Sequence, residues 1–298
     1  MIPLSSVWMV EIVVPKEVRD TVDDVLALRF SAVSAFENEA TGHWTVSGIS
    51  AEKPNREVLE TSLAQAIAPF KIDMPKVQFF ELSSRDWVDE NQANFPPVEV
   101  GRIFVRGSHY DGPVPNGFIG LEINAATAFG SGEHQTTRGC LLALQDLKGK
   151  KFSNPLDIGC GSGILSMSMA KLWNVPVTAV DIDPESVRVS KANLKKNNLS
   201  HLVRVGQGNG YKARLIRGRG PFDLIVANIL LRPLCNMANE LRANLAEGGY
   251  AILSGFFASD LPRIESVHHR VGIRTVRRYV VGDWAAVVLK RSDPMQKN

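Results

Sequence analysis

Apolar and polar positions in residues 1–82 follow two periods, one typical of strands and one typical of helices. Strands are predicted where apolar and β-branched residues run together, at Val7–Val14, Ala32–Phe36, Trp44–Gly48 and Val77–Leu82. Between them, Lys16–Arg29 has apolar residues at helical spacing, and Asn55 stands where it can cap a second helix. The order βαββαβ predicts a ferredoxin-like α+β domain. That fold hosts many functions and names none.

From residue 133 onward, helix and strand patterns alternate. Helical spacing marks residues 133–147, 164–173, 184–197 and 233–245. Short apolar runs, typical of buried strands, lie between or beside them at 155–158, 175–182, 202–205, 222–229 and 250–254. This alternation predicts an α/β domain with a parallel, Rossmann-like sheet. Two further runs, 273–281 and 284–290, flank Gly282–Asp283 and predict a terminal antiparallel hairpin.

The stretch between these two regions shows little periodicity. Residues 85–95 could form a short connecting helix, and Gly107–Gly120 is dense in Gly and Pro, which is typical of a hinge or an ordered crossing loop. We therefore expect a linker over 83–120, the α/β domain over 121–291 and a tail over 292–298.

Charge divides the chain into two unlike parts. The 298 residues have a formal net charge of +3, but residues 1–125 hold 10 basic and 18 acidic side chains. Such an acidic part suits a basic protein partner and would repel nucleic-acid phosphates. The basic stretch Lys212–Gly220 is expected to be a solvated loop, and no direct nucleic-acid contact is predicted.

Several classes of protein are excluded by the composition. No apolar run approaches the 18 or more residues that a membrane span needs, and the first residues lack the basic start of a secretory signal. Cys140, Cys160 and Cys235 lie far apart without metal-ligand pairing, so reduced thiols and no metal site are expected. These features predict a cytoplasmic protein.

A glycine-rich loop follows the first strand of the α/β domain. Residues 156–163 read LDIGCGSG, with Gly159, Gly161 and Gly163 at a spacing of two. Glycines at this turn let a ligand approach the backbone, since no Cβ stands in the way. The nicotinamide fingerprint G-x-G-x-x-G needs a glycine where this chain has Ile164, so that motif fails by one residue.

Polar residues also follow two later strands of the sheet. Asp181 stands 22 residues after Gly159, where a carboxylate can accept both hydroxyl hydrogens of a ribose. Asp183 competes for this role, but it precedes Pro184 and is better placed to cap the next helix. Asn228 ends the fourth strand. Because ligands bind at the carboxyl ends of parallel strands, these marks together predict a nucleoside site.

The combination resembles the seven-stranded S-adenosylmethionine-dependent methyltransferases. Ala128–Leu141 reads AFGSGEHQTTRGCL and is similar to the A-F-G-[ST]-G-x-H-x-T-T-x-x-C-L segment of the ribosomal protein L11 methyltransferase family (PrmA type). Residues 226–230 (VANIL), residues 282–284 (GDW) and the D-W-x-x-x-x-Q-x-x-F pattern at residues 86–95 also match that family. The resemblance covers nearly the whole chain, and it implies an N-terminal substrate-recognition domain.

The resemblance assigns roles to individual residues. It implies that Thr137, Gly159, Asp181 and Asn228 bind S-adenosylmethionine, with Gly161 and Gly163 completing the glycine loop. It places three residues in a loop over the cofactor, namely Phe129, Gly130 and His134. Trp284 is expected to wall the acceptor channel. From chemistry alone, a hydroxyl at the start of a helix, as at Thr136–Thr137, is as often a helix cap. No carboxylate stands after the third strand, so an adenine contact by Asn209 or a backbone amide stays open.

The implied reaction is methyl transfer to lysine ε-amines, and possibly an α-amine, of ribosomal protein L11. We expect catalysis by positioning, with Asn228 orienting the amine and no dedicated general base. A near alternative is lysine methylation of the electron-transfer flavoprotein β subunit. More distant alternatives are a nicotinamide-dependent dehydrogenase and a cofactor-binding module without catalytic activity. The sequence leaves the oligomeric state open.

Overall fold

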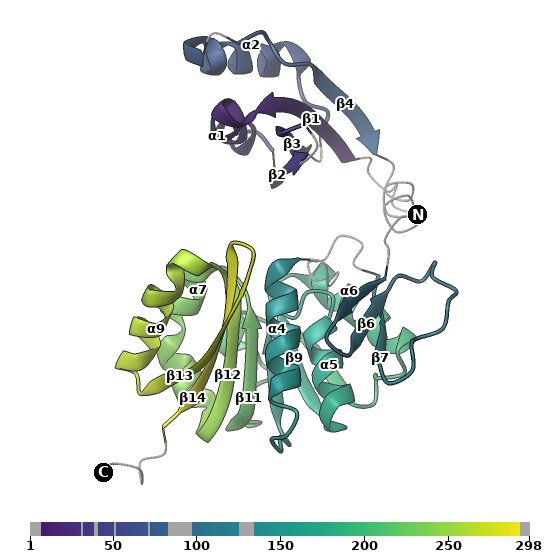
Figure 1. Ribbon diagram of the computed structural model, residues 1–298, viewed down its shortest axis with the longest axis vertical. Helices are drawn as coiled ribbons and strands as arrows, with labels where there is room; N and C mark the ends of the chain where they lie inside the picture. Colours follow the sequence, from purple (N-terminus) through teal and green to yellow (C-terminus); the bar gives the residue numbers. More distant parts are fainter. Residues whose placement is uncertain are drawn as a thin grey trace. The chain divides into compact units, whose positions relative to one another are not determined.

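The computed structural model divides into two compact units, Met1–Asn91 and Gln92–Asn298 (Figure 1). It describes residues 7–30, 32–38, 41–50, 52–70, 72–82, 97–124 and 134–292. The expected helix at residues 85–95, the motif at 86–95, and Phe129 and Gly130 lie outside these ranges. So does the expected tail, apart from its first residue.

The first unit has the predicted βαββαβ order and forms one antiparallel sheet of order β2-β3-β1-β4. Asn55 caps the second helix as expected, because its Oδ1 accepts a hydrogen bond of 3.2 Å from the Val58 amide. Alternate residues of the first strand, Val10, Ile12 and Val14, are buried against the two helices. The elements are β1 (Val7–Pro15), α1 (Lys16–Ala27), β2 (Ala32–Asn38), β3 (His43–Ser50), α2 (Arg56–Ile67) and β4 (Val77–Leu82).

The second unit is built on a seven-stranded sheet of order β10-β9-β8-β11-β12-β14-β13. The first five of these strands run parallel, and the last two form the predicted antiparallel hairpin. The Rossmann-like sheet with a closing hairpin is therefore confirmed. The strands are β8 (Pro155–Ile158), β9 (Val177–Asp181), β10 (Val203–Gln207), β11 (Phe222–Asn228), β12 (Leu245–Phe257), β13 (Ile273–Val281) and β14 (Trp284–Arg291).

Helices cover both faces of this sheet because its central strands are apolar on both sides. Along β11, Leu224 and Val226 join one buried cluster, and Ile225 and Ala227 join another. The first cluster packs under α4 (Gln135–Asp146), α5 (Ile164–Trp173) and α6 (Pro184–Lys196). The second packs under α7 (Leu231–Asn236), α8 (Ala238–Asn244) and α9 (Leu261–Arg270). The single helix expected over 233–245 is thus two short helices, and β12 begins at Leu245.

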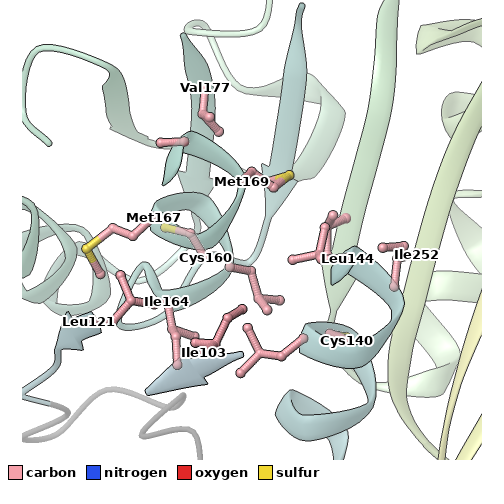
Figure 2. Close-up of a cluster of buried hydrophobic side chains, with 14 of the residues drawn as sticks. Ile103, Leu121, Cys140, Leu144, Cys160, Ile164, Met167, Met169, Val177 and Ile252 are labelled. Carbon is pink, nitrogen blue, oxygen red and sulfur yellow. The ribbon is translucent and has the colours of Figure 1, made fainter. Parts of the chain in front are cut away.

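The linker expected over 83–120 is the main correction to the predicted organisation. Residues 98–122 form a three-stranded sheet of β5 (Val98–Val100), β6 (Ile103–Arg106) and β7 (Ile119–Glu122). Ile103 and Leu121 are fully buried in the same cluster as Cys140 and Ile164 (Figure 2). The sequence did not predict these strands because each is only three or four residues long. That length is too short to show the alternation of apolar and polar residues that is typical of a strand.

That connection is also held by hydrogen bonds. Arg106 donates to the Tyr110 carbonyl over 2.7 Å and to Glu122 over 3.3 Å, and the Ser108 amide donates to Asn124 Oδ1 over 3.2 Å. Of the two alternatives for residues 107–120, the structure shows the ordered crossing loop.

None of the helices in the described ranges is both long and apolar enough to cross a membrane.

We predict that Ile103→Ala lowers the free energy of unfolding of the second unit by about 2–5 kcal/mol, the range for emptying a buried aliphatic site. Ile103→Val is the matched control, expected to cost about 0.5–1.5 kcal/mol. Denaturant titrations of the full chain measure both values. An Ile103→Ala variant as stable as the wild type would show that the small sheet is not part of the core.

Candidate functional site

A cavity of about 500 Å³ lies at the carboxyl ends of the parallel strands in the second unit. Residues that follow β8, β9, β10 and β11 all line it, as expected for ligands of open α/β sheets. Among the predicted site residues, those that line it are His134, Thr137, Gly159, Gly161, Asp181, Asn209, Asn228 and Trp284. A more open groove of about 820 Å³ lies in the first unit and includes none of them.

The glycine loop forms the floor of the cavity. Gly159 has φ = 72°, and a Cβ on it would lie 2.3 Å from Ile229 Cγ2, so no larger residue fits without a shift. Gly163 does not line the cavity. It begins α5 at φ = 84°, where a Cβ would lie 2.9 Å from Ser190 Oγ. Gly163 therefore serves the tight turn and the packing of the loop against α6.

Asp181 is fixed by the backbone on both sides. Its Oδ2 accepts a hydrogen bond of 2.8 Å from the Gly161 amide, and its Oδ1 accepts one of 3.0 Å from the Asp183 amide. Each carboxylate oxygen can accept a further hydrogen bond. Asp183 instead caps α6, accepting from the amides of Glu185 and Ser186, and these hydrogen bonds lower its pKa. The expected helix cap at Asp183 is confirmed, and the ribose contact of Asp181 stays a prediction.

Behind the loop, the Asp157 carboxyl is fully buried and does not line the cavity. The Ser166 hydroxyl donates to its Oδ2 over 2.5 Å, and Oδ1 has no partner among the described residues. Burial raises the pKa of Asp157 to about 7, and the nearby Asp181 charge acts in the same direction. Asp157 thus links the end of β8 to α5 through Ser166.

The N-terminus of α4 is capped by His134 rather than by either threonine. The Thr136 amide donates to His134 Nδ1 over 3.3 Å, while Thr136 and Thr137 are both buried. A backbone amide can only donate, so Nδ1 is an acceptor and the ring proton is on Nε2. The Thr136 hydroxyl, 2.8 Å from Nδ1, must then donate to it.

This arrangement orients Asn228, at the end of β11. Because the Thr136 hydroxyl hydrogen is used by His134, Thr136 Oγ1 accepts from Asn228 Nδ2 over 3.2 Å, and Thr137 Oγ1 lies 3.5 Å from the same nitrogen. Asn228 Oδ1 is left buried and without a hydrogen-bond partner in the part of the chain that is described. An unpaired buried acceptor costs about 1–3 kcal/mol. An acceptor held this way at the wall of a cavity indicates a ligand with an N–H or O–H donor.

Trp284 stands at the start of β14 and lines the same side of the cavity. Its ring packs edge-on to His134 with centroids 4.9 Å apart. Gly282, at φ = 57°, turns the hairpin so closely over α4 that a Cβ would lie 2.4 Å from the Gln135 side chain.

The remaining walls are residues that sequence reasoning did not single out. Thr136 and Leu230 lie inside the quoted motifs without an assigned role, whereas Ile182, Pro233, Met237 and Gly255 lie outside them and are brought to the cavity by the fold. Thr136 had a signal in the paired threonines of the motif. Gly208, Asn209 and Gly210 line the end of the cavity next to β10, and the adenine contact stays an open prediction.

Comparisons with known proteins place this fold and site in one family. The family model for "Ribosomal protein L11 methyltransferase (PrmA)" matches residues 19–292. The chain belongs to the ribosomal protein L11 methyltransferase family. It is 36% identical over 281 residues to the Bradyrhizobium diazoefficiens member, covering 93% of each chain, and 37% identical over 244 residues to the Agrobacterium fabrum member, covering 80% and 81%.

A solved structure supports the fold of this family member. The ribosomal protein L11 methylase of Lactobacillus delbrueckii subsp. bulgaricus superposes with a TM-score of 0.60 at 28% sequence identity. The match covers 66% of this chain and 100% of that one.

The residues of the cavity fit S-adenosylmethionine, the methyl donor that the resemblance implies. Asp181 has lone pairs for ribose hydroxyls, the Gly159 turn admits a ligand close to the backbone, and Asn228 offers an acceptor that no described residue uses. Among the described residues, no group of three His, Cys, Asp or Glu side chains is arranged to hold a metal ion.

We expect Gly159→Ala to weaken binding of S-adenosylhomocysteine by at least about tenfold, since the added methyl group meets Ile229 and the φ is unfavourable for alanine. Gly149→Ala is the control, because a Cβ there meets nothing within 4 Å. Titration calorimetry measures both. Equal affinities for the two variants would mean that the ligand does not depend on this turn.

A pH dependence follows from the cap. Burial lowers the pKa of His134 from its usual 6.5, and the fold needs its neutral form as an acceptor. The stability that the neutral His134 ring contributes is therefore fully present above about pH 6.5. It is lost as the pH falls from there through the lower pKa that His134 has in the folded protein. We predict that the wild type loses stability relative to His134→Asn, which keeps a capping side chain, between pH 7 and pH 5. Thermal unfolding measures this, with exposed His201→Asn as control; a difference that does not change with pH would contradict it.

Proposed function

We propose that this chain transfers methyl groups from S-adenosylmethionine to lysine ε-amines of ribosomal protein L11. The observation that carries the proposal is Asn228 Oδ1 at the cavity wall, which is oriented by Thr136 and His134 and has no partner among the described residues. Membership of the L11 methyltransferase family supports both the reaction and the substrate.

When bound, S-adenosylmethionine supplies an electrophilic methyl group on a sulfonium, so the protein has to provide position and a neutral amine. A free lysine has a pKa of about 10.4 and is protonated at neutral pH. Apolar walls such as Trp284, Leu230 and Met237 disfavour the charged ammonium by desolvation. Asn228 Oδ1 can accept an N–H of the neutral amine. The lone pair of the amine nitrogen then points away from Asn228.

No titratable group that lines the described cavity is arranged as a general base. His134 Nδ1 already accepts from Thr136, and the Asp181 carboxylate ends β9, where its remaining lone pairs are assigned to the ribose. Burial raises the pKa of Cys160, which keeps its thiol protonated. These contacts support catalysis by positioning, with Asn228 as the residue that touches the amine.

The first unit is proposed to recognise the protein substrate. Residues 1–91 hold 8 basic and 15 acidic side chains, whereas the second unit is net basic. An acidic surface attracts a basic protein and repels nucleic acid. We therefore propose ribosomal protein L11 itself as the partner, without direct contact to nucleic acid, and a cytoplasmic location.

The other candidate functions are not favoured. The relatives described above are named for ribosomal protein L11, and none of them for the electron-transfer flavoprotein β subunit. A dehydrogenase does not agree with membership of a methyltransferase family or with Ile164 in the glycine loop.

Incubation of the purified chain with methyl-labelled S-adenosylmethionine and either protein tests the choice of substrate. Label is expected in ribosomal protein L11 and not in the flavoprotein subunit. The reverse result would overturn the proposed substrate and leave the methyltransferase chemistry standing.

We predict that Asn228→Ala lowers the rate of L11 methylation by at least about 100-fold through loss of amine alignment. Affinity for S-adenosylhomocysteine should change far less, since Asp181 and the glycine loop remain. Asn239→Ala, at an exposed position of α8, is the matched control. Methyl transfer and calorimetry give the two numbers. Unchanged turnover in Asn228→Ala would contradict the role assigned to Asn228.

A further inference from the structure

Three large, exposed hydrophobic side chains line the cavity or contact a residue that lines it. Ile182, Leu230 and Phe257 are 64%, 73% and 49% exposed, and each lies at or just after the carboxyl end of a parallel strand. Ile182 and Leu230 line the cavity. Scattered exposed hydrophobic residues are ordinary, but a group at the entrance of a binding site indicates contact with a ligand.

Phe257 is held in its exposed position by the backbone. A register shift between Ser254 and Phe256 interrupts the pairing of β12 with β14. Gly255 makes this shift possible at φ = 96°, where a Cβ would lie 2.2 Å from the Ile229 carbonyl oxygen. After the bulge Phe256 is buried, Phe257 faces outward opposite Trp284, and the Ala258 amide donates to the Asp283 carbonyl over 2.8 Å.

The exposed ring begins an aromatic series that leads into the site. Phe257 stacks on Trp284 with centroids 4.4 Å apart and an interplanar angle of 32°, and Trp284 meets His134 at 4.9 Å. His134 contacts Thr136, which in turn holds Asn228. The series therefore joins the protein surface to the side of the cavity that presents Asn228 Oδ1. Asp181 and the glycine loop, which serve the methyl donor, belong to other strand ends.

We propose that Phe257 is a specificity-determining residue: with Trp284 it contacts the aliphatic stem of the acceptor lysine and so favours ε-amines over amines that lack such a stem. The inference rests on the proposed function. A lysine amine must pass from the surface to Asn228 on four methylene groups, and the aromatic series is an apolar surface along that direction. Each methylene removed from water improves binding by about fourfold.

Two amines of similar basicity and different stem length test this directly. Butylamine and methylamine are measured as competitive inhibitors of L11 methylation by the full-length wild type, Phe257→Ala and Phe257→Leu. In the wild type, butylamine should bind at least about tenfold more tightly than methylamine, since three more methylenes are buried. Phe257→Ala should reduce that ratio several-fold, and Phe257→Leu should keep an intermediate value.

Kinetics on the intact protein substrate give the second readout. Phe257→Ala should raise KM for L11 several-fold with little change in kcat, because Asn228 and its partners stay in place. Affinity for S-adenosylhomocysteine should match the wild type, which also shows that the variant is folded. Val276→Ala, an equally exposed position on β13 away from the cavity, is the control.

The possible results distinguish the role of Phe257 from the proposed function. A Phe257→Ala variant with the wild-type KM and the wild-type amine ratio overturns the role of Phe257 while the proposed function stands. Equal weakening of butylamine and methylamine binding also overturns it, since the Phe257 ring would then stabilise the site without contacting the aliphatic stem. A wild-type protein that methylates no lysine of L11 overturns the proposed function, and the inference with it.

Discussion

The site depends on one hydrogen-bond constraint, the use of both amide hydrogens of Asn228 by buried hydroxyls. Thr136 and Thr137 share Asn228 Nδ2, and Thr136 can accept from it because its own hydrogen is donated to His134. This leaves Oδ1 buried and without a hydrogen-bond partner among the described residues. A buried acceptor that the fold does not satisfy is unfavourable without a ligand, and its presence here ties the local structure to binding.

The same constraint joins distant parts of the second unit. Asn228 ends β11, His134 caps α4, and Trp284 begins β14, so three segments that are far apart in sequence meet at one wall of the cavity. The opposite wall is fixed separately, through the hydrogen bond between the Gly161 amide and Asp181. In the proposed function, donor and acceptor substrates are therefore positioned by elements that do not compete for the same side chains.

Much of this could be predicted from the sequence, where a residue's role follows from its neighbours in the chain. The alternation of strands and helices, the hairpin around Gly282–Asp283, and the division between Asp181 and the capping Asp183 are of this kind. The motifs also identified His134 and Asn228. They could not show that His134 rather than a threonine caps α4, since both residue types accept hydrogen bonds and only the fold decides their directions.

Other features depend on contacts that no local pattern carries. The strands within residues 98–122 are stabilised by burial against α4 and α5, which outweighs the loop-forming tendency of the Gly and Pro residues around them. Phe257 gave no signal in the sequence because its position depends on the bulge at Gly255 and on pairing with β14. In the proposed function, residues of this kind define the shape of the acceptor side, while the motif residues define its chemistry.

We propose that this chain methylates ribosomal protein L11 and that Asn228 positions the amine. Mass spectrometry of L11 from cells tests this most directly. L11 from cells that lack this chain should carry unmethylated lysines, and the wild-type chain should restore the methyl groups while Asn228→Ala should not. Methylation that persists in the cells without the chain, or that Asn228→Ala restores in full, would contradict the claim.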